Sequence, residues 1–414
     1  MSAVPRTRST SSAATTRARS TAPAPGERTR TLDRFGGRVE LRVQAGPGRS
    51  AQAEHRLDRA VALLAEFDRR LSRFDASSEL CRLNADPRDR VPASPMMQRF
   101  AEAVGWAGRR SDGLVDASVL PAVEAAGYVA HFDRAELDRV RLKDAARPWA
   151  PSTPSALTEH PAATLAGAPG TPVPAPEDRL ADDGHELMDA LGAALHALAG
   201  EQALLDAHAP AATWRDVRAG DGCVVRPAGL RLDSGGIGKG LAADLAAELL
   251  RGAPSWVVDC GGDLRIGGTA GQPRAVDITD PYDRSRVLHR LHVTRGGVAT
   301  SGVTRRSWDQ DGERRHHLID PRTGRPADTG VLQVTALAPT ALEAEVIAKT
   351  ALLGGEAQAH TQLPHGGVIV CANGLVIVVP PPKVSQRPVR RPATRARFDV
   401  PGYGTLTRLV ERPR

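Results

Sequence analysis

The 414-residue chain has a formal net charge of +7, and 41% of its residues are hydrophobic, which is enough to build a globular core. Residues 1–31 carry six Arg and one Glu (+5), and residues 382–414 carry nine basic and two acidic residues (+7), so the rest of the chain is at 7 − 12 = −5. The positive charge therefore belongs to two Arg-rich tails and not to a nucleic-acid-binding surface, and we expect no nucleic-acid partner. The four cysteines are too scattered to indicate a zinc site or a disulfide framework.

Membrane insertion and secretion are also disfavoured by the sequence. No run of about 18 apolar residues predicts a transmembrane segment. The Arg-rich N-terminus has neither the apolar stretch of a signal peptide nor a lipobox. We therefore expect a cytoplasmic protein.

The predicted elements follow one another without a regular βαβ repeat. A disordered basic tail over 1–31 precedes one domain at 32–381, which contains a flexible Pro-rich insertion at about 146–178, and a basic Pro/Arg-rich tail covers 382–414. Helical periodicity predicts helices over 52–72, 95–110, 184–204, 241–252 and 341–353. Apolar or alternating runs predict strands over 35–45, 213–218, 223–226, 229–233, 255–260, 275–279, 287–293, 331–338 and 367–379. This mixture favours the α+β class, with a mixed β-sheet core and flanking helices.

A glycine-dense turn, LDSGGIGKG (232–240), runs directly into the helix predicted at 241–252. Glycines let the backbone approach a ligand closely, and the N-terminus of the helix directs N–H groups and positive potential at the turn. The turn therefore suits an anion, most plausibly a phosphate. Neither a Walker loop nor a GxGxxG motif fits its spacing, and taken alone it is equally well explained as a tight turn before a helix.

Five other polar motifs lie in loops between apolar elements. They are SRFDASSELCRLN (72–84), DGLVDAS (112–118), DCGGD (259–263), ATSG (299–302) and HHLIDPRTGRP (316–326). Each alone has a structural explanation, because Asp and Ser cap helices and the DPRTG segment favours a turn. A histidine placed as His317 is, beside an apolar strand, is more often structural than catalytic.

Together, and in this order, these motifs closely resemble the ApbE family, the FAD:protein FMN transferases. The resemblance covers about residues 32–381. It implies an ApbE-like catalytic domain that takes FAD as substrate, transfers the FMN half to a Ser or Thr hydroxyl of an acceptor flavoprotein, and releases AMP with the help of Mg²⁺. Family members commonly work outside the cytoplasm, so the resemblance also allows an extracytoplasmic location.

The resemblance implies a role for each matching residue. His317 would be the catalytic base that deprotonates the incoming hydroxyl, and Lys239 would hold phosphate during the transfer. The other residues implied to bind FAD are Ser72, Phe74 and Ser78 along the flavin, Asp116 and Ser118 in place of an Asp-x-Thr motif, Gly235 and Gly236 at the phosphates, Asp244 at the adenosine end, Gly262 and Asp263 in a second turn, and Thr300 and Ser301 of the ATSG motif.

The implied magnesium site is where this chain departs from the family pattern. Family members hold Mg²⁺ with an Asp, a Thr four residues later and a carbonyl of the glycine turn. Here Glu345 takes the Asp position, Gly238 supplies the carbonyl, and Lys349 takes the Thr position. Lys349 puts Mg²⁺ binding in doubt, and two interpretations stay open: an i,i+4 ion pair with Glu345, or an ammonium group where the metal would lie.

Two other functions are consistent with the same residues. One is an FAD-binding protein of this fold without transferase activity. The other is an FAD pyrophosphatase that yields FMN and AMP with water as the acceptor.

Overall fold

The computed structural model describes residues 26–129, 213–310 and 313–382, and the backbone of 18–20, 394–400 and 404–410. The chain divides into two units, Met1–Pro380 and Pro381–Arg414. The predicted insertion at 146–178 and the predicted helix at 184–204 lie outside the described residues. Within the described part of the chain, no helix combines the length and apolar character needed to cross a membrane.

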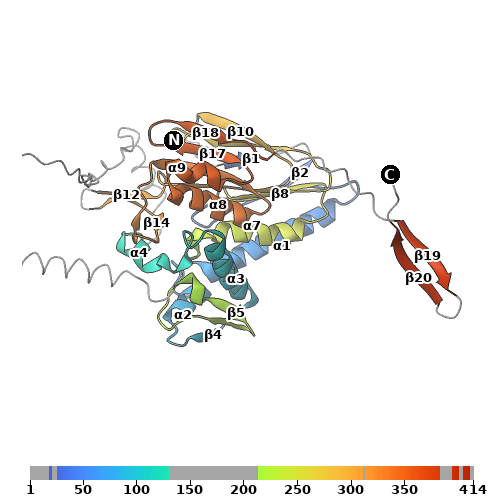
Figure 1. Ribbon diagram of the computed structural model, residues 1–414, viewed down its shortest axis with the longest axis horizontal. Helices are drawn as coiled ribbons and strands as arrows, with labels where there is room; N and C mark the ends of the chain where they lie inside the picture. Colours follow the sequence, from blue (N-terminus) through green and yellow to red (C-terminus); the bar gives the residue numbers. More distant parts are fainter. Residues whose placement is uncertain are drawn as a thin grey trace, which may run out of the picture. The chain divides into compact units, whose positions relative to one another are not determined.

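An eight-stranded sheet forms the centre of the first unit (Figure 1). From edge to edge its strands are β18 (Val376–Val379), β17 (Gly367–Cys371), β16 (Val331–Ala338), β11 (Gly296–Gly302), β8 (Leu264–Gly267), β7 (Ser255–Cys260), β3 (Gly37–Gln44) and β2 (Glu27–Arg34). Every pairing in this sheet is antiparallel. The α+β prediction is confirmed, but the expectation of a mixed sheet is wrong, because successive strands of the sheet pair antiparallel to one another.

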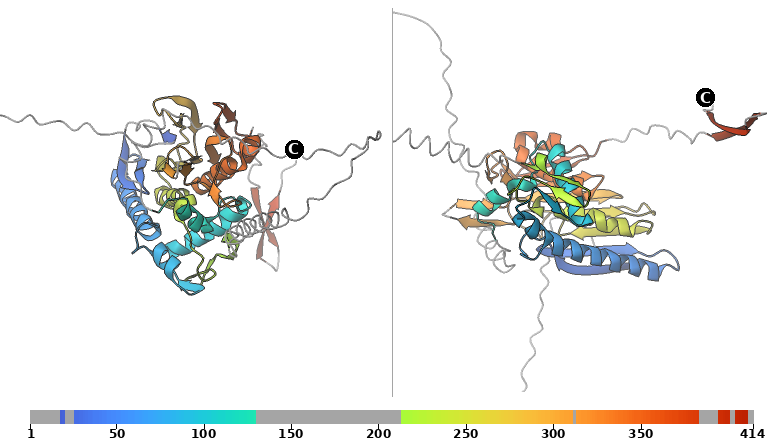
Figure 2. Two further views of the ribbon diagram at one scale, coloured as in Figure 1. Left: turned by 90° about the vertical axis from the view of Figure 1, so that its left-hand side faces the viewer. Right: turned by 90° about the horizontal axis from the view of Figure 1, so that it is seen from below.

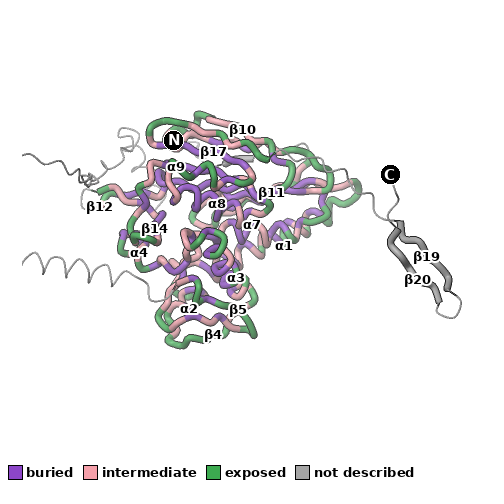
Figure 3. Tube along the Cα trace, viewed as in Figure 1, coloured by how far each residue is buried: buried purple, intermediate pink, exposed green. Residues whose placement is uncertain are grey.

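The central strands are covered on both faces. Strands β11 and β17 are buried along their whole length, which explains why they read as continuous small or apolar runs without alternation (Figure 3). Helices α1 (Ser50–Leu71), α7 (Gly238–Leu250) and α8 (Ala341–Gly354) pack against one face. A three-stranded sheet, β1 (Ala18–Ser20), β9 (Arg274–Thr279) and β10 (Val287–Val293), contributes Val276 and Ile278 to an apolar cluster with strands β7, β8 and β11.

Local sequence explains why the helices form where they do. In α1 the buried residues recur at three- and four-residue steps from Ala53 to Leu71, and the helix runs alongside the β2–β3 hairpin (Figure 2). Helix α8 begins after Thr340, whose side chain accepts from the N–H of Glu343, and it ends at Gly354, before the C-cap Gly355, which has a φ of 83°. Helices α7 and α8 pack so closely that a Cβ on Gly240 would lie 2.7 Å from the carbonyl oxygen of Ala341.

A smaller substructure lies at the N-terminal end of the glycine turn. It contains helices α2 (Glu79–Ala85) and α3 (Pro95–Arg110), the 3₁₀ helix η2 (Trp214–Asp216), and a sheet of β4 (Arg90–Pro92), β6 (Cys223–Val225) and β5 (Arg218–Gly220). The other described elements of the first unit are η1 (Ala117–Val119), α4 (Leu120–Ala125), η3 (Ser234–Gly236), β12 (Ser307–Gln310), β13 (Glu313–His316), β14 (Ile319–Asp320), β15 (Arg325–Pro326), α9 (Glu356–Ala359) and η4 (His360–Gln362).

The structure corrects several sequence predictions. Strand β2 begins at Glu27, inside the predicted N-terminal tail, because a charged edge strand pairs through its backbone and leaves little apolar signal. No strand spans 213–218 or 229–233: the first contains η2, and the second has no regular structure. The second unit contains an antiparallel pair, β19 (Thr394–Val400) and β20 (Gly404–Val410), within the predicted Pro/Arg-rich tail.

Candidate active site

A cavity lies where the glycine turn, the end of α1 and the segments around α4 and β14 meet. Its walls are formed by residues of the β2–β3 turn, of the end of α1, of the segment 114–128, of the glycine turn, of the 317–321 segment and of α8. Eight sequence-predicted residues line it: Ser72, Phe74, Asp116, Gly235, Gly236, Gly238, Lys239 and His317. Motifs up to 245 residues apart in the sequence (72 to 317) therefore meet at one site.

The glycine turn is fixed from both sides. The Asp233 side chain accepts from the N–H of Gly235 at 3.1 Å, and the Ser234 hydroxyl donates to the carbonyl of Leu71 at 2.7 Å. Arg73 lies 3.4 Å from the Asp233 carboxylate. The turn then enters the 13-residue helix α7 at Gly238, so the N-terminal end of a helix faces the cavity. This arrangement suits an anionic group of a ligand.

Two lysines and two carboxylates form a charge network beside this turn. Lys239 makes an ion pair with Asp263, and its Nζ lies 4.0 Å from Oε1 of Glu345. The Nζ of Lys349 donates to the same Oε1 at 2.9 Å, while Oε2 of Glu345 accepts from the N–H of Gly240 at 2.8 Å. Lys239 and Lys349 line the cavity, whereas both carboxylates are only 1% exposed and lie behind them.

Burial shifts the titration of the innermost pair. It raises the pKa of Glu345 and lowers the pKa of Lys349, because each charged form loses its water. The opposite charge of the partner counters both shifts. Each charge of the Glu345–Lys349 pair therefore depends on its partner, and removing one partner would leave the other charge buried without compensation.

Asp244 has a role that the sequence did not predict. Its two carboxylate oxygens accept from the N–H groups of Ala341 and Leu342, each at 2.9 Å, so it caps α8, and it also lies 3.0 Å from Nε of Arg265. It is not among the residues that line the cavity. The expectation of an adenosine contact therefore has no support here. Asp244 of α7 caps α8, and Glu345 of α8 binds the first turn of α7.

Other predicted residues also lie behind the cavity wall. The N–H of Gly262 donates to Asp259 at 2.7 Å, and the hydroxyls of Thr300 and Thr335 lie 2.8 Å apart in the sheet. Thr300, Ser301 and Asp263 are each at most 2% exposed. Asp263 pairs with Lys239 and accepts from the N–H of Thr300 at 3.4 Å, and Gly262, Asp263, Thr300 and Ser301 are not among the residues that line the cavity.

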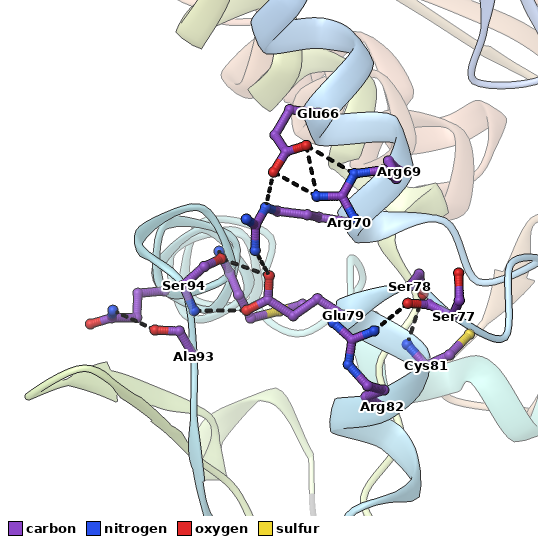
Figure 4. Close-up of polar contacts among 12 residues, drawn as sticks. Glu66, Arg69, Arg70, Ser77, Ser78, Glu79, Cys81, Arg82, Ala93 and Ser94 are labelled. Atoms are coloured by element: carbon purple, nitrogen blue, oxygen red, sulfur yellow. Dashed lines mark hydrogen bonds and ion pairs between the residues drawn. The ribbon is translucent and has the colours of Figure 1, made fainter.

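The predicted flavin-binding residues of the 72–84 segment also differ in whether they line the cavity. Ser72 and Phe74 line the cavity, but Ser78 is the N-cap of α2, where its hydroxyl accepts from the N–H of Cys81 at 3.0 Å (Figure 4). The neighbouring Glu79 is held by Arg70 and Ser94. The Ser78 position therefore has a structural explanation.

Asp116 and Ser118 form one unit. The carboxylate of Asp116 lines the cavity and accepts from both the N–H and the hydroxyl of Ser118, at 2.8 and 2.7 Å. Burial raises the pKa of Asp116, and the two bonds from Ser118 oppose that shift. Ser118 thus orients Asp116 but does not itself line the cavity.

The predicted residue Phe74 belongs to an aromatic wall whose other members the sequence analysis did not predict. The ring of Tyr128 stacks on Trp308 with centroids 5.7 Å apart, meets Phe74 edge-on at 5.6 Å, and lies 6.4 Å from the ring of His317. The guanidinium of Arg73 lies over both Phe74 and Tyr128, at 4.1 and 4.4 Å from their centroids. Phe74, Tyr128 and Arg73 all line the cavity, so this part of its wall can contact a ring system through aromatic and cationic groups.

The β2–β3 turn completes this wall. Phe35 has a φ of 57° and Gly36 a φ of 68°, as a two-residue hairpin turn requires. The N–H of Phe35 donates to Asp68 at 3.2 Å, and its ring meets Phe67 edge-on at 5.9 Å; both rings line the cavity. Aromatic residues are rare in this chain, with 6 Phe, 3 Tyr and 5 Trp, and among those the structure describes, Phe35, Phe67, Phe74 and Tyr128 line the cavity.

The two adjacent histidines have different environments. His316 is fully buried, its Nε2 lies 2.8 Å from the carbonyl oxygen of Ala327, and its Nδ1 accepts from the N–H of Leu318 at 3.2 Å. His317 lines the cavity beside Tyr128. The motif therefore supplies one structural histidine and one histidine at the site.

We expect the environment of His316 to make folding sensitive to acid. Burial lowers the pKa of His316 from 6.5 to about 4, so the unfolded chain takes up a proton that the folded chain refuses. Stability is therefore lost as the pH falls from about 6.5 to about 4, by up to about 3 kcal/mol. Urea unfolding across this range should show a steeper loss for the unmodified protein than for His316→Asn. Parallel curves would contradict the assignment, and the exposed His292→Ala variant is the control.

The residues at the implied magnesium position do not fit a divalent ion. The ammonium of Lys349 occupies the side-chain position next to Glu345, and both oxygens of Glu345 already accept hydrogen bonds. The hydroxyl of Thr350, the next residue, donates to the carbonyl of Val346 at 2.9 Å. Within the described ranges, no group of three or more His, Cys, Asp or Glu side chains could hold a metal ion.

The chain is similar in sequence to known proteins. The chain is 40% identical over 121 residues to an FAD:protein FMN transferase of Salmonella typhimurium, covering 28% of this chain and 35% of the relative. It is 36% identical over 141 residues to one from Treponema pallidum, covering 31% of this chain and 39% of the relative. These matches span about a third of the relatives' lengths.

Solved structures show the same fold. The ApbE protein of Thermotoga maritima superposes with a TM-score of 0.60 at 21% identity, over 85% of this chain and 96% of that chain. The apo flavinyl transferase ApbE of Pseudomonas stutzeri gives 0.58 at 18% identity, over 85% and 94%. The sequence model of the ApbE family matches residues 35–161 and 185–370, more than half of the chain. The chain therefore belongs to the ApbE family.

Proposed function

We propose that this protein takes FAD as its substrate and transfers the FMN half to a Ser or Thr hydroxyl of an acceptor flavoprotein. The observation that carries the proposal is the shared cavity, in which an aromatic wall, a helix N-terminus with Lys239, and His317 face the same space. A planar flavin ring, a diphosphate and a reacting hydroxyl need these three surfaces. Membership of the ApbE family and relatives named FAD:protein FMN transferases support it.

The proposed reaction balances as a phosphoryl transfer. The acceptor oxygen forms a bond to the phosphorus on the riboflavin side of FAD, and the bond from that phosphorus to the bridging oxygen breaks. AMP leaves with the bridging oxygen, and the proton of the hydroxyl passes to the imidazole of His317. The N-terminal end of α7 and Lys239 oppose the negative charge of the diphosphate throughout.

The positioning residues follow from the contacts. Asp263 holds Lys239 from behind, and Ser234 and Asp233 fix the turn against α1. Asp116 and Ser118 lie near the aromatic wall, where a polar edge of the flavin could be bound. The binding role of these residues is part of the proposal. No step is assigned to magnesium, because the residues at its implied position do not fit it.

We expect the acceptor to become fluorescent when this protein, FAD and a candidate acceptor flavoprotein from a neighbouring gene are incubated together. The flavin should survive denaturing electrophoresis, because the phosphoester bond is covalent. FMN in place of FAD, with the acceptor present, is the control, since FMN lacks the AMP leaving group and should give no label. Free FMN as the main product would indicate a pyrophosphatase, and intact bound FAD would indicate a binding protein; either result contradicts the proposal.

A further inference from the structure

Lys349 is placed to act on whatever occupies the cavity. It lies one turn after Glu345 in α8, it is only 9% exposed, and it is part of the cavity wall. Its Nζ is held at 2.9 Å by Oε1 of Glu345. An ammonium group has three N–H donors, and the Glu345 carboxylate takes one of them. A buried lysine that a carboxylate fixes in place and that faces a cavity is not explained by packing alone.

Charged groups face Lys349 from three elements. They are Glu345 of its own helix, Lys239 of α7, and Asp263 of the turn between β7 and β8. The two lysines and two carboxylates sum to zero charge, so the network is compensated without a further ion. The lysines line the cavity and the carboxylates do not. The two ammonium groups therefore face the cavity, and the two carboxylates that compensate them lie on the side away from it.

The same contacts leave no place for a divalent cation beside Glu345. One carboxylate oxygen is bound by Lys349 and faces Lys239, and the other accepts from Gly240. A protonated lysine offers no lone pair to a metal, and its charge opposes the approach of one. Thr350 cannot supply the missing oxygen, because its hydroxyl donates to the backbone of α8.

We propose that the ammonium group of Lys349 is a built-in cation for the diphosphate of the substrate, so that FMN transfer by this protein does not require a bound divalent metal ion. The proposal rests on the proposed function. Lys349 and Lys239 would present their N–H donors and positive charge to the diphosphate and to the charge that develops on the leaving AMP, while Glu345 and Asp263 hold them in place from behind. Lys349 is then a catalytic residue. A threonine at this position would restore the charge only by binding a metal ion.

The test has an activity arm and a binding arm. Flavin transfer by the unmodified protein should be the same in EDTA and in saturating Mg²⁺. Lys349→Thr should lose about 10²-fold in EDTA, the usual effect of removing one electrostatic stabiliser, and should recover when Mg²⁺ is added. Mn²⁺ alone, followed by electron paramagnetic resonance, should bind to Lys349→Thr and not to the unmodified protein. Lys349→Arg retains the charge and should retain activity in EDTA.

Each outcome decides between the alternatives. Loss of transfer by the unmodified protein in EDTA, or one Mn²⁺ bound to it and lost in Glu345→Gln, overturns the built-in cation. FAD titration and thermal melting show whether Lys349→Thr is folded. If it is unfolded, Lys349→Arg and the unmodified protein still test the proposal. Absence of transfer by the unmodified protein under both conditions refutes the proposed function, and the Mn²⁺ arm then decides the role of Lys349 alone.

Discussion

Replacing His317 with alanine is expected to slow flavin transfer about 10²–10⁴-fold while FAD binding stays within a few-fold. His317 lines the cavity near Tyr128, where it can reach an incoming hydroxyl. In the proposed mechanism His317 is the general base, so its removal affects proton transfer and leaves the aromatic wall, the glycine turn and Lys239 in place. Single-turnover transfer rates and FAD titration of the same preparation would separate the two effects.

The pH profile identifies the role of His317 more sharply than the rate alone. Transfer by the unmodified protein should fall as the pH drops and the imidazole becomes protonated, and the residual rate of His317→Ala should lose that dependence. His292→Ala, an exposed histidine of β10, is the matched control and should behave as the unmodified protein does. Unchanged transfer in His317→Ala would make His317 a structural residue.

Replacing Glu345 with glutamine is expected to reduce the free energy of unfolding by about 3–5 kcal/mol. The carboxylate is 1% exposed, and it compensates Lys349 at 2.9 Å and Lys239 at 4.0 Å. Without it, Lys349 would keep a buried charge that has lost its partner. Urea unfolding monitored by circular dichroism measures the loss.

Two further variants test this explanation. Glu102→Gln removes a carboxylate from an exposed pair with Arg99, in which both side chains are more than half exposed, and should cost at most about 1 kcal/mol. The double variant Glu345→Leu/Lys349→Met removes both charges and should regain much of the stability that Glu345→Gln loses. A Glu345→Gln variant as stable as Glu102→Gln would show that the network does not need its central carboxylate.

The sequence predicted those parts of the site that depend on local motifs. The glycine turn, Lys239 and His317 lie in short segments whose turn and helix signals are contained within a few residues, and all of them line the cavity. Helices α1, α3 and α8 were predicted within a few residues, because their apolar periodicity is local, and α3 and α8 also begin at the local caps Ser94 and Thr340.

Features that depend on distant partners could not be predicted in this way. Asp244 caps a helix that begins 97 residues later, so its partner is invisible in its own segment. Tyr128 and Arg73 meet only because α1 and α4 end at the same cavity. Strand β2 is polar because it lies at the edge of the sheet, and its pairing with β3 is encoded in the turn at Phe35 and Gly36. The cytoplasmic location stays a prediction.

The most direct measurement is the ratio of AMP released to flavin attached in one reaction. Intact-mass spectrometry of the acceptor and quantitation of AMP should give one AMP for each acceptor molecule that gains the mass of a phosphoester-linked FMN. AMP should not accumulate when the acceptor hydroxyl is removed. AMP and free FMN formed in equal amounts without an acceptor would contradict the account, because the cavity would then activate water and not a protein hydroxyl.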